Sequence, residues 1–266
     1  MRSVHELMSL QGRVAAITGG AGHIGRAFAQ SLAELGCNIC ILDVAKDRAE
    51  EVASSLRDTY RVKASSFVAD ITDERQVAEM AQHIVKAHQR LDILINNAAY
   101  PSLSVAEDGK KLEDQTLEQW EPNVNVCLRG TFLTTRAVTP LLRQSKNASI
   151  VNIASIYGVV GPDMRLYDGL EMGNSAWYAA AKGGIVQLTR YLASTLAPSI
   201  RVNCIAPGGV WRNQPESFHV RYVARTPLQR MAVEEDLCGA AVFFTSDLSS
   251  YVTGQVLLVD GGWTSW

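Results

Sequence analysis

Tyr178 and Lys182 could together exchange a proton with a substrate, because they stand four residues apart in the segment Tyr178-Ala179-Ala180-Ala181-Lys182. In a helix this spacing puts the phenol and the ammonium group on one face, where the positive charge favours the phenolate. A free tyrosine has a pKa of about 10 and is a poor base at neutral pH, so general acid–base chemistry needs such a neighbour. The same spacing also arises by chance in helices that carry out no chemistry. A functional interpretation of this pair therefore needs support from other parts of the sequence.

A glycine-rich turn, Thr18–Gly25, supplies that support. It follows an apolar run typical of a buried strand and precedes a helix with one apolar face. Gly20, Gly22 and Gly25 fit the pattern G-x-G-x-x-G, which lets backbone N–H groups approach a pyrophosphate. Alone, the pattern is also compatible with a merely tight turn. Asp43 ends the next apolar run, where a carboxylate can accept both ribose hydroxyls, so the sequence predicts a dinucleotide site.

Apolar runs alternate with amphipathic helices along the whole chain. Connections of a dozen or more residues between consecutive strands require a parallel sheet with right-handed crossovers and helices on both faces. We therefore expect an α/β, doubly wound, seven-stranded parallel sheet in a single domain covering residues 1–266. The expected strands are residues 13–18, 37–43, 62–69, 91–95, 149–155, 200–205 and 255–259, and the expected helices are residues 26–35, 46–57, 73–88, 117–143, 176–196, 214–223 and 233–246. A polar segment, residues 158–175, is expected to be a loop.

Composition narrows the classes of partner. The chain has 266 residues, of which 47% are hydrophobic, and its net charge of −2 comes from 25 basic and 27 acidic residues without blocks. This pattern favours neither nucleic acid nor a membrane as a partner. The start of the chain lacks a signal-peptide pattern and the five cysteines have no disulfide spacing, so we expect a cytoplasmic protein. Cys37 and Cys40 should point to opposite faces of a strand, and we expect no metal site.

These landmarks occur in an order that resembles the short-chain dehydrogenase/reductase family in its single-domain form, over nearly the whole chain. Besides Thr18–Gly25, Asp43 and the Tyr178/Lys182 pair, the matching positions are Asp70, Asn96-Asn97-Ala98, Asn125, Ser155, Pro207-Gly208, Tyr251–Gln255 and Val259–Gly262. The resemblance implies a Rossmann-like sheet and hydride transfer between NAD(P) and a carbinol or carbonyl carbon.

The resemblance also implies roles for four catalytic residues. Tyr178 would give or take the hydroxyl proton, while Lys182 would lower the pKa of Tyr178 and hold the nicotinamide ribose. Ser155 would polarise the substrate oxygen and Asn125 would position a water for proton relay. Ser155 and Asn125 could also be ordinary strand-end and helix residues, and Asp70 only a residue near a helix cap. The residues expected to contact the cofactor are Gly19, Gly22, His23, Ile24, Gly25, Asp43, Asp70, Ile71, Asn97, Ala98, Tyr178, Lys182, Pro207, Gly208 and Val210.

Three departures from the family pattern bear on the function. His23 stands where single-domain members commonly have glycine, and the resulting pattern resembles sugar-nucleotide epimerases and dehydratases. Ser155 and Tyr178 lie farther apart than is usual, so residues 158–175 form an insertion that we expect to wall the substrate pocket. The threonine expected shortly after Pro207-Gly208 is replaced by Trp211-Arg212-Asn213-Gln214.

The leading hypothesis is an NAD-dependent dehydrogenase acting on a small, polar, hydroxylated substrate, best fitted by a sugar or sugar derivative. The alternatives are an epimerase or dehydratase that retains NAD, and a non-catalytic nucleotide sensor. The residues that favour a polar substrate are Asp163, Arg165, Tyr167 and Asp168 in the insertion, and Arg212, Asn213 and Gln214 after Pro207-Gly208.

NAD is expected over NADP because the carboxylate of Asp43 would repel a 2′-phosphate. Residues 44 and 45 are uncharged, Lys46 and Arg48 already belong to the next helix, and His23 is the one candidate cation in the turn. By the family resemblance, we also expect a homotetramer built on residues 117–143 and 176–196.

Overall fold

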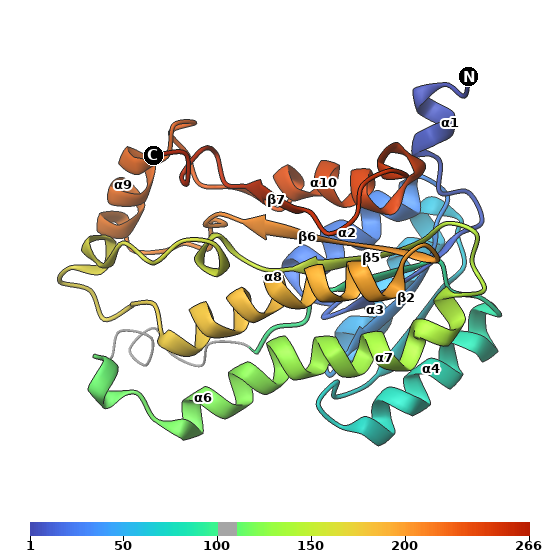
Figure 1. Cartoon of the computed structure of the whole chain (residues 1–266), viewed down its shortest axis with the longest axis horizontal. Helices are drawn as coiled ribbons and strands as arrows, with labels where there is room; N and C mark the ends of the chain where they lie inside the picture. The colour runs from blue at the N-terminus through green and yellow to red at the C-terminus, as the bar shows by residue number, and fades with distance from the viewer. Residues whose placement is uncertain (101–110) are drawn as a thin grey trace.

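Seven parallel strands form one sheet in the order β3-β2-β1-β4-β5-β6-β7 (Figure 1). The computed structural model describes residues 1–100 and 111–266. The strands are β1 (Val14–Thr18), β2 (Asn38–Asp43), β3 (Ala64–Val68), β4 (Ile93–Asn96), β5 (Ala148–Ile153), β6 (Ile200–Pro207) and β7 (Val256–Val259). The α-helices are α1 (Val4–Met8), α2 (His23–Glu34), α3 (Lys46–Tyr60), α4 (Glu74–His88), α6 (Leu117–Val124), α7 (Thr131–Leu142), α8 (Ala176–Leu196), α9 (Glu216–Arg225) and α10 (Glu235–Thr245). Shorter helical turns are η1 (Leu112–Asp114), η2 (Asn125–Gly130), η3 (Ile156–Gly158), η4 (Met164–Tyr167) and η5 (Asp247–Ser249).

The strand order reverses direction between β1 and β4. Strands β2 and β3 extend the sheet on one side of β1, whereas β5, β6 and β7 extend it on the other side of β4. In an open parallel sheet such a reversal leaves a crevice at the carboxyl ends of the two central strands, because their connections leave in opposite directions. The predicted doubly wound, Rossmann-like, seven-stranded fold is confirmed.

Helices cover both faces of the sheet, and each face has its own apolar core. One core joins the sheet to α2, α3 and α10 through residues such as Phe28, Leu56 and Phe244 (Figure 1). The other joins it to α4, α7 and α8 through residues such as Met80 and Leu142. Alternate strand residues enter the two cores because neighbouring side chains on a strand point to opposite faces.

Cys37 and Cys40 illustrate this alternation. The first lies in the core against α2 and α3, the second in the core against α4 and α7, and both thiols are fully buried. Burial raises the pKa of the Cys40 thiol to about 11. The two cysteines are on opposite faces as expected, and neither is a reactive thiolate.

The helix expected over residues 117–143 is continuous but not uniform. Helix α6 passes into the π-helical turn η2 and then into α7, without leaving helical backbone angles at Val124 or Thr131. Gly130, at the end of η2, packs so tightly that a Cβ atom there would lie 2.6 Å from the side chain of Ile71. Short π-helical turns are frequent at functional sites. Here the turn brings the helix against a residue expected to contact the cofactor.

Helix α1 lies outside the expected elements. It begins with a capping box in which the Ser3 hydroxyl accepts from the Glu6 N–H at 3.2 Å and the Glu6 carboxylate accepts from the Ser3 N–H at 2.6 Å. The pattern Ser-x-x-Glu is the sequence signature of such a start. Among the described residues, no helix has the length and apolarity to cross a bilayer.

Two histidines share one serine hydroxyl beneath α4. The Nε2 atom of His88 lies 2.8 Å from the Ser65 hydroxyl, and Nε2 of His83 lies 3.3 Å from the same oxygen. His88 is only 7% exposed. Burial, with the nearby charges of Lys63 and His83, lowers the pKa of His88 to about 4.

We predict that this histidine makes the protein less stable in mild acid. The folded-state pKa lies below the ordinary value of about 6.5, so the unfolded chain binds the extra proton first as the pH falls below 6.5. The free energy of unfolding should therefore drop by about 2 kcal/mol between pH 6.5 and pH 5 from this group alone. Urea unfolding of the wild type and of His88→Gln at pH 7.5 and pH 5 measures this loss of unfolding free energy. An equal loss in both proteins would contradict the assignment to His88.

Candidate active site

Two adjoining cavities open over the carboxyl ends of the central strands. The first, of about 610 Å³, runs beside the glycine turn and the ends of β2, β3 and β4. The second, of about 440 Å³, lies between the ends of β5 and β6 and the first turns of α8. Ile24, Asn97 and Arg212 line both, so the two cavities form one cleft.

The glycine turn forms the wall of the first cavity. Gly19 adopts φ +62°, and a Cβ atom there would lie 2.8 Å from the Cα atom of Ala98. A Cβ atom on Gly25 would collide with the carbonyl oxygen of Gly19, whereas one on Gly22 would meet only that oxygen, at 3.3 Å. Gly19 and Gly25 thus permit tight packing, and Gly22 leaves the start of α2 open toward the cavity. This cradle fits the diphosphate of a dinucleotide at a helix N-terminus.

Asp43 is fixed at the end of β2 beside that turn. Its carboxylate accepts from the Ala21 N–H at 3.0 Å and from the Ala45 N–H at 3.0 Å. It lines the first cavity, as expected for a residue that binds ribose hydroxyls. Arg48 lines the same cavity, although its place on α3 suggested that it would point elsewhere. A cation therefore borders the ribose end of the cleft.

The far end of the first cavity is formed by residues after β3. Asp70 and Ile71 line it together with Val126 of η2. The Asp70 carboxylate accepts from both the backbone N–H and the hydroxyl of Thr72 at 2.8 Å. This short turn holds Asp70 at the cavity edge, where the base of a dinucleotide would lie.

The second cavity contains the two residues expected to form an acid–base pair. Tyr178 and Lys182 reach it from the first turns of α8, and Ser155 reaches it from the end of β5. The Lys182 ammonium group is buried, donates to the Ile153 carbonyl at 2.9 Å and lies 5.9 Å from the centre of the Tyr178 ring. The Ser155 hydroxyl accepts from the Tyr157 N–H at 3.2 Å. One cavity therefore brings together a phenol, a cation and a hydroxyl.

Several aromatic side chains line the rest of this cavity, together with polar ones such as Asn174 and Gln214. The hydroxyls of Tyr157 and Tyr167 lie 3.2 Å apart, and the Tyr222 hydroxyl accepts from the Gly209 N–H at 2.5 Å. Burial raises the pKa of Tyr157 far above its usual range and that of Tyr222 to about 12, so both phenols stay neutral at physiological pH. The other large apolar residues in the wall are Ile156, Trp177, Phe218 and Met231.

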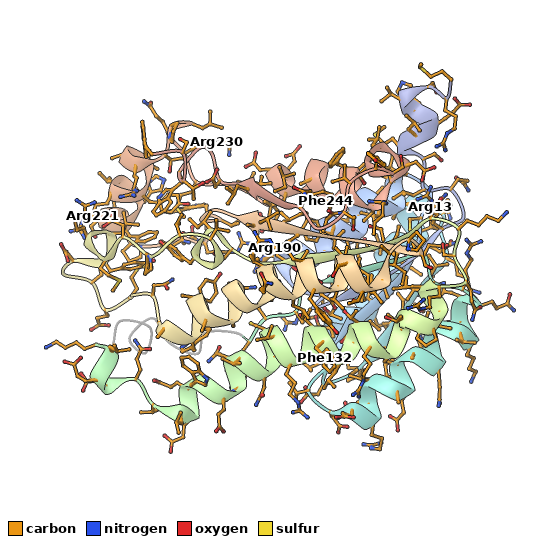
Figure 2. All side chains as sticks on the ribbon, in the orientation of Figure 1. Arg13, Phe132, Arg190, Arg221, Arg230 and Phe244 are labelled. Carbon is orange, nitrogen blue, oxygen red and sulfur yellow. The ribbon has the colours of Figure 1, made fainter. Side chains whose placement is uncertain are left out.

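Residues 158–175 wall this cavity in part, through Tyr167 and residues 173–175. Asp163 does not face it, because its carboxylate pairs with Arg165 at 2.8 Å and with Arg225 of α9. The bond from Arg165 lowers the pKa of Asp163 to about 2. Arg221, near the same segment in Figure 2, donates to the Asp168 carbonyl at 2.6 Å. Asp163 and the Asp168 carbonyl thus attach the insertion to α9, and the charged side chains of the insertion line neither cavity.

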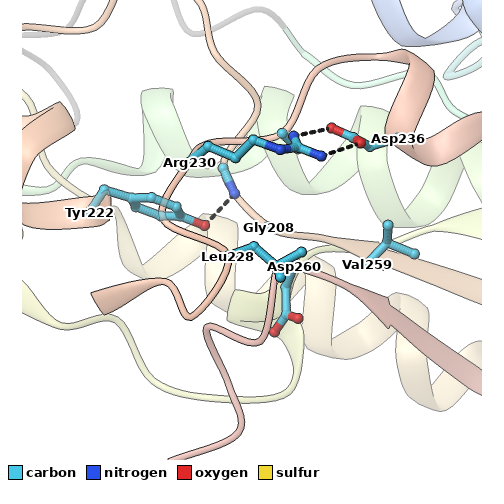
Figure 3. Close-up of a pocket in the computed structure, with 10 residues that line it drawn as sticks. Gly208, Tyr222, Leu228, Arg230, Asp236, Val259 and Asp260 are labelled. Atoms are coloured by element: carbon cyan, nitrogen blue, oxygen red, sulfur yellow. Dashed lines mark hydrogen bonds and ion pairs between the residues drawn. The ribbon is translucent and has the colours of Figure 1, made fainter. Parts of the chain in front are cut away.

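A third, smaller cavity of about 120 Å³ lies behind Gly208 and Asp260 (Figure 3). Arg230 closes it by a two-bond pair with Asp236, at 2.6 and 2.7 Å. Because this cavity is small, we interpret it as part of the packing beneath the loop after β6 rather than as a ligand site.

Most of the expected site residues meet in the cleft. The first cavity receives Gly19, Gly22, His23, Ile24, Asp43, Asp70, Ile71, Asn97 and Ala98, and the second receives Ser155, Tyr178, Lys182, Pro207, Gly208 and Val210. Gly25 lies beneath the turn, and Asn125, the first residue of η2, lines neither cavity. The aromatic wall was not expected, because its members come from segments far apart in sequence. Within the described residues, no cluster of three or more His, Cys, Asp or Glu side chains could hold a metal ion.

Comparison with known proteins agrees with this cleft. Residues 19–264 match the family model described as enoyl-(acyl carrier protein) reductase. A 3-oxoacyl-[acyl-carrier-protein] reductase of Thermotoga maritima is 32% identical over 96% of this chain and 99% of its own. A cis-4-hydroxycyclohexanecarboxylate dehydrogenase of Sinomonas cyclohexanicum is 36% identical over 95% of this chain and 97% of its own.

Among solved structures, an NAD⁺-bound xylitol dehydrogenase superposes with a TM-score of 0.84 at 29% identity, covering 95% of this chain and 99% of the other. With a family model that spans nearly the whole sequence and relatives above 30% identity, the chain belongs to the short-chain dehydrogenase/reductase family of oxidoreductases.

Proposed function

We propose that this protein is an NAD-dependent dehydrogenase that oxidises a secondary alcohol to a ketone, or catalyses the reverse reduction. The observation that carries the proposal is the shared cavity of Tyr178, Lys182 and Ser155, which opens directly into the cavity of the glycine turn. A nucleotide sensor would not need a buried lysine beside a phenol in this position. Nothing in the geometry favours an epimerase or dehydratase.

In the oxidation, the carbinol C–H bond breaks with its electron pair and the O–H bond breaks with loss of a proton, which leaves a ketone. A bound nicotinamide supplies the acceptor for the hydride. Tyr178 takes the proton, and the buried cation of Lys182 favours the phenolate that does so. Ser155 donates a hydrogen bond to the substrate oxygen and holds it beside Tyr178. Asn125, which lines neither cavity, would act only through a water.

We propose a ring-bearing alcohol as the substrate, rather than the sugar expected from the sequence. Asp163 of the insertion pairs with arginines away from the cavity. Aromatic and apolar side chains form much of the cavity wall, beside polar ones such as Asn174 and Gln214. Aromatic walls bind flat apolar surfaces. The relative named cis-4-hydroxycyclohexanecarboxylate dehydrogenase supports a substrate with a ring. The similar xylitol dehydrogenase supports a polyol, which is the alternative substrate class.

We predict that Tyr178→Phe lowers kcat on the best cyclic alcohol by about 10²–10⁴-fold, because the ring still packs but the proton acceptor is lost. The substrate is found by following NADH formation at 340 nm with cyclohexanols, aryl carbinols, polyols and aldoses. Wild type should turn over the cyclic alcohols faster than the polyols and aldoses. NADH binding, measured by fluorescence titration, should stay within about threefold of wild type.

Tyr157→Phe is the matched control, because Tyr157 lines the same cavity without a lysine one helical turn away. Its kcat should stay within tenfold of wild type. A Tyr178→Phe enzyme that keeps more than a tenth of wild-type kcat would refute the role of Tyr178.

We propose that Asp43 sets the preference for NAD, by about 2 kcal/mol or about thirtyfold in kcat/KM over NADP. In Asp43→Ser the repulsion is gone and Arg48, in the same cavity, becomes available to a 2′-phosphate, so the preference should shrink or reverse. Asp43→Ser/Arg48→Gln should lose that gain for NADP. Measurement of kcat/KM with both cofactors tests this. Equal use of NADP by the wild type, or an unchanged ratio in Asp43→Ser, would contradict it.

We also propose a homotetramer in the cytoplasm. Exposed aromatic side chains on α6, α7 and α8 support an interface there: Trp120 is 36%, Phe132 42% and Tyr191 60% exposed. Leu257 and Leu258, each 37% exposed on the edge strand β7, support a second one. The five cysteines are all unpaired, which supports a reducing compartment. Light scattering that gave the mass of one 29.0 kDa chain would exclude the tetramer.

A further inference from the structure

Arg212 holds a cation at the junction of the two cavities. It lines both of them, and it stands in the loop after β6, where the sequence departs from the family pattern. Its backbone is held firmly, because Trp211 N–H donates to the Ala232 carbonyl at 2.8 Å and Arg212 N–H donates to the Gln214 side chain at 2.7 Å. The Arg212 guanidinium in turn donates to the Trp211 carbonyl at 2.6 Å, which holds it against its own loop.

One carboxylate joins Arg212 to the glycine turn. The Oε1 atom of Glu234, just before α10, lies 2.8 Å from the Arg212 guanidinium and 3.7 Å from Nδ1 of His23, the first residue of α2. Because both distances are measured to the same oxygen, the arginine is a close neighbour of the helix start where a diphosphate would lie. Glu234 thus bridges the two walls of the cleft.

The bridge is easily broken. The side chains of Arg212 and Glu234 are 33% and 29% exposed, and His23 is 77% exposed. Ion pairs this close to solvent contribute little stability. A diphosphate offers the guanidinium more charge and more acceptor oxygens than one carboxylate does. The exchange of partner is therefore favourable when a dinucleotide binds.

We propose that Arg212 exchanges Glu234 for the cofactor diphosphate, and that Glu234 competes for Arg212 in the empty protein. This inference rests on the proposed dinucleotide function, and it adds Arg212 as a residue that recognises the cofactor diphosphate. Among the described residues that line the second cavity, Lys182 and Arg212 are the charged ones, so a substrate carboxylate is the rival ligand for Arg212. The position of Arg212 beside the helix start favours the diphosphate.

The test is calorimetric titration of the cofactor-free protein with ADP-ribose and with AMP, which lacks the second phosphate. Arg212→Gln should weaken ADP-ribose binding by about tenfold and AMP binding by less than twofold. Arg212→Lys, which keeps the charge, should retain most of the affinity. Glu234→Gln should tighten ADP-ribose binding by about twofold to fivefold, because Arg212 no longer has a charged competitor. That gain should vanish in Arg212→Gln/Glu234→Gln.

Arg230→Gln is the matched control, because it breaks another arginine–carboxylate pair at the start of α10, outside both cleft cavities (Figure 3). It should leave ADP-ribose affinity within twofold of wild type. A wild-type protein that binds neither ADP-ribose nor NADH would overturn the proposed function itself. Unchanged ADP-ribose affinity in Arg212→Gln would overturn only the exchange, and a rise in substrate KM alone would assign Arg212 to the substrate. Weaker binding in Glu234→Gln would also overturn the exchange.

Discussion

The cleft depends on how β1 is joined to the segment that follows β4. The buried Thr18 hydroxyl accepts from the backbone N–H groups of Asn97 and Ala98 at 3.0 and 3.1 Å, and the Asn97 amide donates to the Thr18 and Gly19 carbonyls. These bonds lie where the strand order reverses, and they satisfy backbone groups of the segment after β4. They hold the glycine turn against Ala98 and so determine the shape of the first cavity.

A second buried hydrogen-bond network connects β4 and β5 to α8, the helix that carries Tyr178 and Lys182. The Asn96 amide donates to Asn152 at 2.9 Å, and the Asn152 amide donates to Thr189 of α8 at 2.9 Å. Lys182, two turns earlier on α8, donates to the carbonyl at the end of β5. Because buried polar groups are costly unless paired, these contacts fix α8 in one register on the sheet. The distance between the first cavity and Tyr178 is therefore determined by these buried contacts in the core rather than by loops.

The sequence predicted the sheet, the helices and most of the cleft, because periodicity and short motifs determine strands, helices and the turn after β1. It did not predict the partners of side chains in irregular segments. The Asp163 carboxylate pairs with Arg225, which lies 62 positions later in the sequence, and no local sequence pattern predicts such a pair. Arg48 faces the cavity because of the direction in which α3 leaves β2, and the π-helical turn at Asn125 changes the helical register without changing the apolar pattern. Long-range pairing and side-chain direction decide such features.

The electrostatics of the second cavity support Tyr178 as the proposed acceptor of the substrate proton. Its described lining contains no Asp, Glu or His, and burial keeps the Tyr157 and Tyr222 phenols neutral. Of these three rings, that of Tyr178 is the one with the Lys182 ammonium group close by, at 5.9 Å from its centre. An apolar, aromatic wall also keeps the local dielectric low, which strengthens the attraction between a phenolate and this cation. The aromatic and apolar lining that supports the proposal of a ring-bearing substrate is thus also consistent with Tyr178 as the proposed base.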